Sequence, residues 1–97
     1  MNLEQTQNKK DYRKPQTIFS LQEREEIKAR AYNLLQNVKD GVQIYLADML
    51  FVSKNNINMA FAGRNMKLMA RIKSFVEAYE ISPEEALSYA KQFQRTT

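Results

Sequence analysis

The chain has 97 residues and a formal net charge of +4, and it contains neither cysteine nor histidine. Its length fits one domain with a single small core, and its composition excludes disulfides, the usual zinc ligands and the usual nucleophile–base pairs of enzymes. The polar residues 2–20 do not resemble a signal peptide, and no apolar run approaches the roughly 20 residues of a membrane span. We therefore expect a cytoplasmic protein that is not an enzyme and uses no cofactor, metal, membrane or small-molecule ligand.

The N-terminal residues 1–19 lack any apolar periodicity and contain Pro15, so we predict a flexible arm. The arm carries more basic than acidic side chains. Its basic residues are Lys9, Lys10, Arg13 and Lys14. Such a tail either keeps the domain soluble or adds contacts to an anionic partner.

A helix start signal follows the arm. Ser20 and Glu23 have the spacing of a capping box, and Phe19 precedes them where a hydrophobic staple would lie. We predict a helix over residues 21–39, ended by Gly41 at its C-cap. Its apolar positions fall mostly on one face: Leu21, Ile27, Ala31, Leu34, Leu35 and Val38.

Two short helices are predicted next. The first covers about residues 43–50, and a turn follows near Phe51-Val52. Ser53 is a typical N-cap for the second helix. That helix runs to about Ala62, where Gly63 ends it.

Two further helices complete the chain. One begins near Asn65 or Met66, and its apolar stripe is Leu68, Met69, Ile72, Phe75, Val76 and Tyr79. Ser82-Pro83 starts the other helix, with a cap followed by proline at the first helical position. We expect its inward side chains to be Ala86, Leu87, Ala90 and Phe93. The sequence thus predicts an all-α fold with five helices, forming one domain over residues 20–97.

Residues 43–64 meet the requirements of a helix-turn-helix unit, in which two helices cross at a wide angle over a short turn. Ala47 supplies the small side chain where the helices cross. Apolar residues fall at offsets that fill the angle: Leu46, Leu50, Val52, Ile57 and Ala60 or Phe61. The opposite face of the second helix is largely polar: Ser53, Lys54, Asn55, Asn58 and Met59. An outward face of this kind can enter the major groove of DNA.

At these residues the chain resembles the phage repressor and Cro class of helix-turn-helix proteins (XRE-like). Gln43 opens the motif, Ala47 follows four residues later, and Val52-Ser53 precedes the second helix. An aliphatic residue and a small core residue stand fourteen and seventeen positions after the glutamine. The resemblance is clear over residues 43–64 and looser over residues 20–93. It implies a compact five-helix, repressor-like domain that binds specific double-stranded DNA as a homodimer and regulates transcription in a phage or mobile element.

The resemblance also assigns roles by position. Lys54 and Asn55 would reach base edges, the lysine on guanine and the asparagine on adenine. Asn58 and Met59 would make further groove contacts, and Gln43 would brace a phosphate or an adjoining residue. Residues after the second helix would hold phosphates. The complete predicted set is Gln43, Ser53, Lys54, Asn55, Asn58, Met59, Arg64, Asn65 and Lys67.

Phe51 departs from the family pattern, which has glycine at this place in the turn. A bulky residue with positive φ there would cost roughly 1 kcal/mol or more. Three interpretations follow: the turn takes another conformation, an apolar contact holds the ring, or the ring is an exposed anchor for a partner.

The charge distribution adds modest support for a nucleic-acid partner. Residues 43–75 contain five basic side chains against Asp48 alone. If the protein binds DNA, it should be associated with the nucleoid. The dimer interface would come from the last helix or from the outer face of the first. Two other functions remain open: a protein-interaction adaptor derived from a helix-turn-helix domain, and an accessory DNA factor in recombination, replication or partition.

Overall fold

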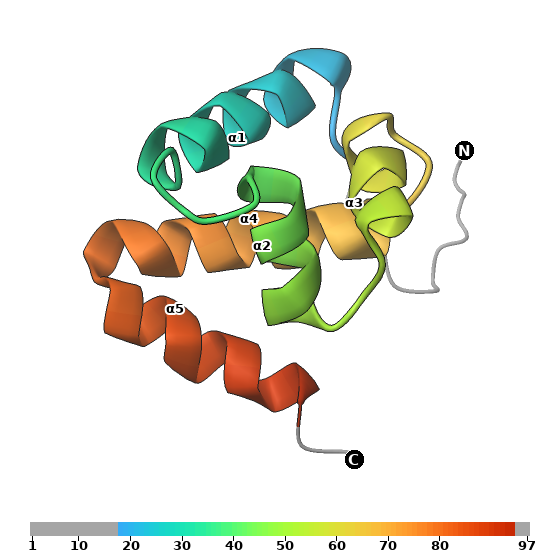
Figure 1. Ribbon diagram of the computed structural model, residues 1–97. Coiled ribbons are helices and arrows are strands. Elements are labelled where there is room, and N and C mark those ends of the chain that lie inside the picture. The colour runs from blue at the N-terminus through green and yellow to red at the C-terminus, as the bar shows by residue number, and fades with distance from the viewer. Residues whose placement is uncertain (1–17, 95–97) are drawn as a thin grey trace, which may run out of the picture.

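Helices are the regular structure throughout residues 18–94, the part of the chain that the computed structural model describes (Figure 1). The elements are α1 (Leu21–Leu34), α2 (Val42–Leu50), α3 (Lys54–Phe61), α4 (Met66–Ile81) and α5 (Pro83–Ala90), followed by the short 3-10 helix η2 (Lys91–Phe93). This confirms the predicted all-α fold of five helices. The flexible arm predicted for residues 1–19 falls almost entirely on residues 1–17, which lie outside the described residues.

The longest helix, α4, is the centre of the fold. It contacts each of the other four α-helices, and Figure 1 shows it running across the middle of the molecule between α1 and α5. Its Phe75 is fully buried, with the rings of Tyr45 and Tyr79 each 6.1 Å from it between centroids. The largest fully buried side chains are Phe75, Leu35, Leu46, Leu50, Ile57, Met69, Ile72 and Val76. Both helices of the helix-turn-helix segment therefore share the core of α4.

Three predicted helix starts are confirmed by their hydrogen bonds. The Ser20 hydroxyl accepts from the Glu23 backbone N–H at 3.1 Å, and the Glu23 carboxylate accepts from the Ser20 N–H at 2.9 Å. Ser53 and Ser82 cap α3 and α5 in the same way, each accepting from a backbone N–H three residues later. Such caps satisfy N–H groups that have no partner within the helix.

The predicted end of the first helix is wrong by about five residues. α1 ends at Leu34, and the residues from Leu35 to Asp40 form turns. The apolar period suggested a longer helix because Leu35 is buried even though it lies outside the helix. The Val38 N–H donates to the Leu35 carbonyl across a tight turn, at 3.1 Å. Gly41, with φ 96°, is the N-cap of α2 rather than the C-cap of α1.

Two residues predicted to face inward are exposed instead. Leu21 is 60% exposed in the first turn of α1, and Leu87 is 43% exposed on α5. The buried face of α5 consists of Ala86 and Ala90, whose small side chains let α5 pack closely. A leucine one position from this narrow stripe therefore lies at its edge.

An ion pair joins α1 to the C-terminal half of α4. The Arg30 guanidinium donates to both carboxylate oxygens of Glu80, at 2.9 and 2.6 Å. This pairing lowers the pKa of Glu80 and raises the pKa of Arg30 from their ordinary values. Both side chains are about two-fifths exposed, so the pair adds little to stability. Among the described helices, none has the length and apolar character to cross a membrane.

Candidate nucleic-acid interface

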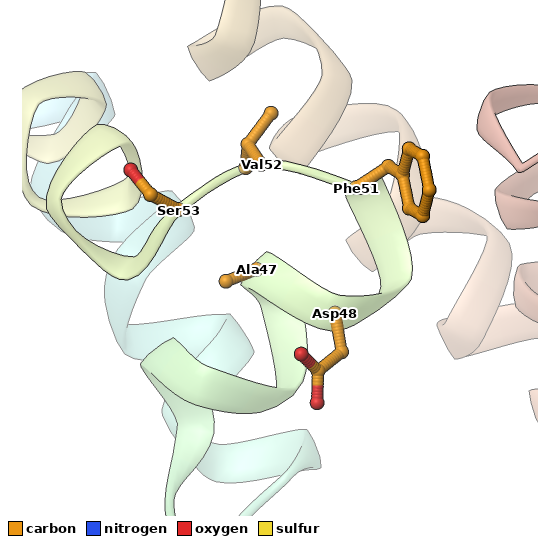
Figure 2. Close-up of a pocket in the computed structure, with 5 residues that line it drawn as sticks. All are labelled: Ala47, Asp48, Phe51, Val52 and Ser53. Carbon is orange, nitrogen blue, oxygen red and sulfur yellow. The ribbon is translucent and has the colours of Figure 1, made fainter.

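The angle between α2 and α3 is filled by apolar side chains, as the sequence predicts. Ala47 is buried in this bend, and Figure 2 shows it between the end of α2 and the start of α3. Leu46 and Leu50 of α2 are fully buried, as are Ile57 and Ala60 of α3. The two helices are thus held at a fixed angle by their inner faces, which leaves the outer face of α3 available for a partner.

Phe51 occupies the left-handed conformation that the family pattern gives to glycine. Its φ is 61° and its ψ is 44°, and its N–H donates to the Ala47 carbonyl. The ring is 53% exposed and points away from Ser53 across the turn (Figure 2). With Ala47, Asp48, Val52 and Ser53 it lines an open depression. The turn therefore keeps the left-handed geometry despite the bulky residue.

The strain at Phe51 predicts a stabilising substitution. Asparagine tolerates the left-handed region better than phenylalanine, so Phe51→Asn should raise the free energy of unfolding by up to about 1 kcal/mol. Denaturant unfolding measures the change. Phe51→Leu is the matched control, because it shortens the side chain without relieving the backbone. An asparagine variant less stable than the wild type would show that the ring contributes more to stability than the backbone strain costs.

The outward face of α3 carries the side chains predicted to read bases. Lys54, Asn55 and Asn58 are all exposed. At 3.6 residues per turn they fall within an arc of about 100°. Met59 lies one turn from Asn55, whose side-chain amide donates to its sulfur at 3.7 Å. The structure therefore places these four predicted residues on one side of α3, across the helix from the buried Ile57 and Ala60, with Met59 half-buried at the edge of this face.

Two other predicted contact residues have structural roles at helix starts. The Ser53 hydroxyl accepts from the Asn56 N–H, and the Asn65 side-chain oxygen accepts from the Leu68 N–H, both at 3.1 Å. Each side chain still has a hydrogen-bond donor to offer: the serine hydroxyl proton and the asparagine NH₂ group. A phosphate contact by either residue would thus be compatible with its cap.

The start of α2 differs from the starts of the other four α-helices. Its N-cap is Gly41, which has no side chain to accept from the first-turn N–H groups. The predicted contact residue Gln43 is the second residue of this helix and is half-buried. Uncapped N–H groups and the positive end of the helix dipole both favour an anion at such an end.

Charge is polarised along α4. The basic residues of the segment 64–73 are Arg64, Lys67, Arg71 and Lys73, and the acidic residues of 74–85 are Glu77, Glu80, Glu84 and Glu85. In Figure 1 α3 lies beside the N-terminal part of α4, so the basic end of α4 is next to α3. Two of these cations already have neighbours, because Lys73 pairs with Glu77 at 2.6 Å and Arg71 stacks on Phe93 at 4.6 Å. The predicted phosphate contacts Arg64 and Lys67 are both exposed at this end.

Arg24 has a role at this site that its sequence context does not indicate. This half-buried residue of α1 donates to the carbonyl oxygens of Phe61, at the end of α3, and of Phe19. Its position in a run of charged residues indicated only a solvated helix face. No local pattern could have revealed a bond between residues 37 positions apart.

Comparisons with protein-family models, curated proteins and solved structures give no significant match for this chain.

Proposed function

We propose that the protein binds specific sequences of double-stranded DNA by inserting α3 into the major groove. The observation that carries this proposal is the row of Lys54, Asn55 and Asn58 on the exposed face of a helix whose opposite face is buried. Asparagine can form two hydrogen bonds to adenine, and lysine can donate to guanine O6 and N7. Met59 adds an apolar contact suited to a thymine methyl group.

Positions around α3 supply contacts to the phosphates. The uncapped start of α2 with Gln43 would bind one phosphate, and Arg64 and Lys67 would bind others. The acidic C-terminal half of α4 would point away from the DNA. This polarity would orient the domain as it approaches the polyanion.

The unit would act as a homodimer, because a single helix-turn-helix unit buries little surface and a two-fold dimer reads two half-sites. Two surfaces offer exposed apolar residues for an interface. Ile81 and Leu87 lie at and beyond the end of α4, and Leu21 and Tyr32 lie on α1. On the resemblance to phage repressors and Cro, we propose a transcriptional regulator. An accessory factor in recombination, replication or partition would use the same contacts.

Selection of bound sequences from a pool of random duplex DNA tests the proposal. A preferred sequence should be recovered, and a dimer should give two half-sites about 10 base pairs apart or a multiple of that spacing. Failure to enrich any sequence would contradict sequence-specific binding.

Salt dependence gives an independent prediction. Two phosphate-neutralising cations per subunit, Arg64 and Lys67, imply that a dimer loses roughly 10²-fold in affinity between about 50 and 200 mM salt. Fluorescence anisotropy on the selected duplex measures this loss. An affinity that does not change with salt concentration would contradict binding through the DNA phosphates.

A second candidate function is favoured by Phe51, whose exposed ring is held at a backbone cost. In this alternative the domain is a protein-interaction adaptor that docks a partner at the turn after α2. The adaptor would show no DNA binding even at low salt. The salt titration therefore separates the two functions.

A further inference from the structure

Arg24 connects the end of α3 to the start of α1. Its Nε donates to the Phe61 carbonyl at 3.0 Å, and its Nη1 donates to the Phe19 carbonyl at 2.9 Å. The planar guanidinium presents these donors in a fixed geometry, which an ammonium group does not reproduce. The side chain thus bridges two backbone positions that are far apart in the sequence.

In the last turn of α3, the Phe61 carbonyl is the one that accepts no hydrogen bond from a nearby backbone N–H group. The carbonyls of Asn58, Met59 and Ala60 accept from the backbone N–H groups of Ala62, Arg64 and Gly63, at 3.0, 2.8 and 3.0 Å. These bonds turn the chain sharply after the helix. Arg24 supplies the fourth bond from another helix, and its positive charge suits the C-terminal end of a helix dipole.

Gly63 makes room for this arrangement. Its φ is 89°, and a Cβ built on it would lie 2.9 Å from Arg24 Cζ and 3.0 Å from Nη1. The guanidinium is therefore packed directly against the loop that follows α3. In Figure 1 the start of α1 lies beside this loop.

We propose that Arg24 is a positioning residue, which fixes the C-terminal end of α3 so that its outer face is held in register with DNA. This inference rests on the proposed function. α3 has eight residues, too few to be a stable helix without tertiary contacts. Asn58, Met59 and Arg64 lie in or just after its last turn, so their placement depends on how that turn is held. Hydrogen bonds to base edges weaken steeply when their geometry is lost.

Two substitutions test the proposal against a matched control. Arg24→Met keeps the length of the side chain and removes its donors, whereas Arg24→Lys keeps the charge and loses the two-pronged geometry. Arg30→Met is the control, because it removes the same charge from the same helix where the partner is the exposed Glu80. Binding is measured on a duplex of about 20 base pairs with the selected sequence and on a scrambled duplex of equal length. All measurements are made at a temperature where melting curves show each variant folded.

The expected result is a loss confined to specific binding. Arg24→Met should weaken binding to the selected duplex about tenfold more than Arg30→Met does, with nearly equal binding of the two variants to the scrambled duplex. Arg24→Lys should fall between Arg24→Met and the wild type. Equal affinities of Arg24→Met and Arg30→Met for the selected duplex would overturn the proposal. So would a uniform loss on both duplexes with a salt slope reduced by about one, because that marks a direct phosphate contact.

Amide hydrogen exchange in the free protein tests the same contact without DNA. Arg24→Met should accelerate exchange at Gly63 and Arg64 by about tenfold relative to Arg30→Met, because the turn after α3 opens more often. Unchanged exchange at both amides would refute a holding role. If the wild type binds neither duplex, the proposed function fails, and exchange alone decides whether Arg24 holds the end of α3. If Arg24→Met does not fold, Arg24→Lys is judged by the same two measurements.

Discussion

Replacing either Lys54 or Asn55 by alanine is expected to weaken binding of the selected DNA site by about 1–3 kcal/mol, a rise in Kd of roughly 5- to 150-fold. Both side chains are exposed in the first turn of α3, where a helix in the major groove makes its base contacts. The Lys54 side chain would lose its bonds to guanine, and Asn55 its paired bonds to adenine. Anisotropy titrations with the selected duplex give the two Kd values directly.

The matched control is Arg30→Ala. Arg30 pairs with Glu80 in the C-terminal part of α4, and its removal changes the net charge as Lys54→Ala does. That part of α4 lies at the side of the molecule away from α3 (Figure 1). Long-range attraction to DNA should fall equally in both variants, and only Lys54→Ala should lose discrimination against altered bases. Wild-type affinity in both Lys54→Ala and Asn55→Ala would show that α3 is not the reading helix.

The helices were largely predictable because their start signals are local. The serine caps before α1, α3 and α5 act within four residues, so the sequence alone identifies them. The end of α1 was not predictable in this way. Leu35 and Val38 keep the helical apolar period, yet they pack through a turn. An apolar pattern reports which side chains are buried, and it does not distinguish a helix from a turn that buries the same side chains.

In the candidate interface too, some features follow from local sequence and others depend on tertiary packing. The exposed row on α3 follows from the spacing of Lys54, Asn55 and Asn58, because a helix places such residues on one face. The role of Arg24 depends instead on how α1 packs beside the end of α3, which no local pattern encodes. The conformation of Phe51 is a further case, since its side chain argues against positive φ and the fold nonetheless imposes it. Tertiary packing overrides the preference of this one residue.

The largest expected effect on stability comes from a substitution on the buried face of α3. Ile57 is fully buried in the bend between α2 and α3. Ile57→Ala should lower the free energy of unfolding by about 2–5 kcal/mol, from lost burial and from the cavity that remains. A small domain has only about 5–15 kcal/mol in total, so the variant should melt at a much lower temperature. Denaturant unfolding and thermal melting measure the loss.

The two faces of α3 should therefore separate stability from recognition. Ile57→Val, which removes one methyl group, should cost about 0.5–1.5 kcal/mol, and Asn58→Ala on the exposed face should change stability by no more than about 0.5 kcal/mol. Ile57→Val should bind the selected duplex normally at a temperature where it is folded, whereas Asn58→Ala should bind it less tightly while remaining stable. An Ile57→Ala variant as stable as Ile57→Val would mean that this side chain does not anchor the bend. In that case the inner face of α3 would not fix the angle at which its outer face meets DNA.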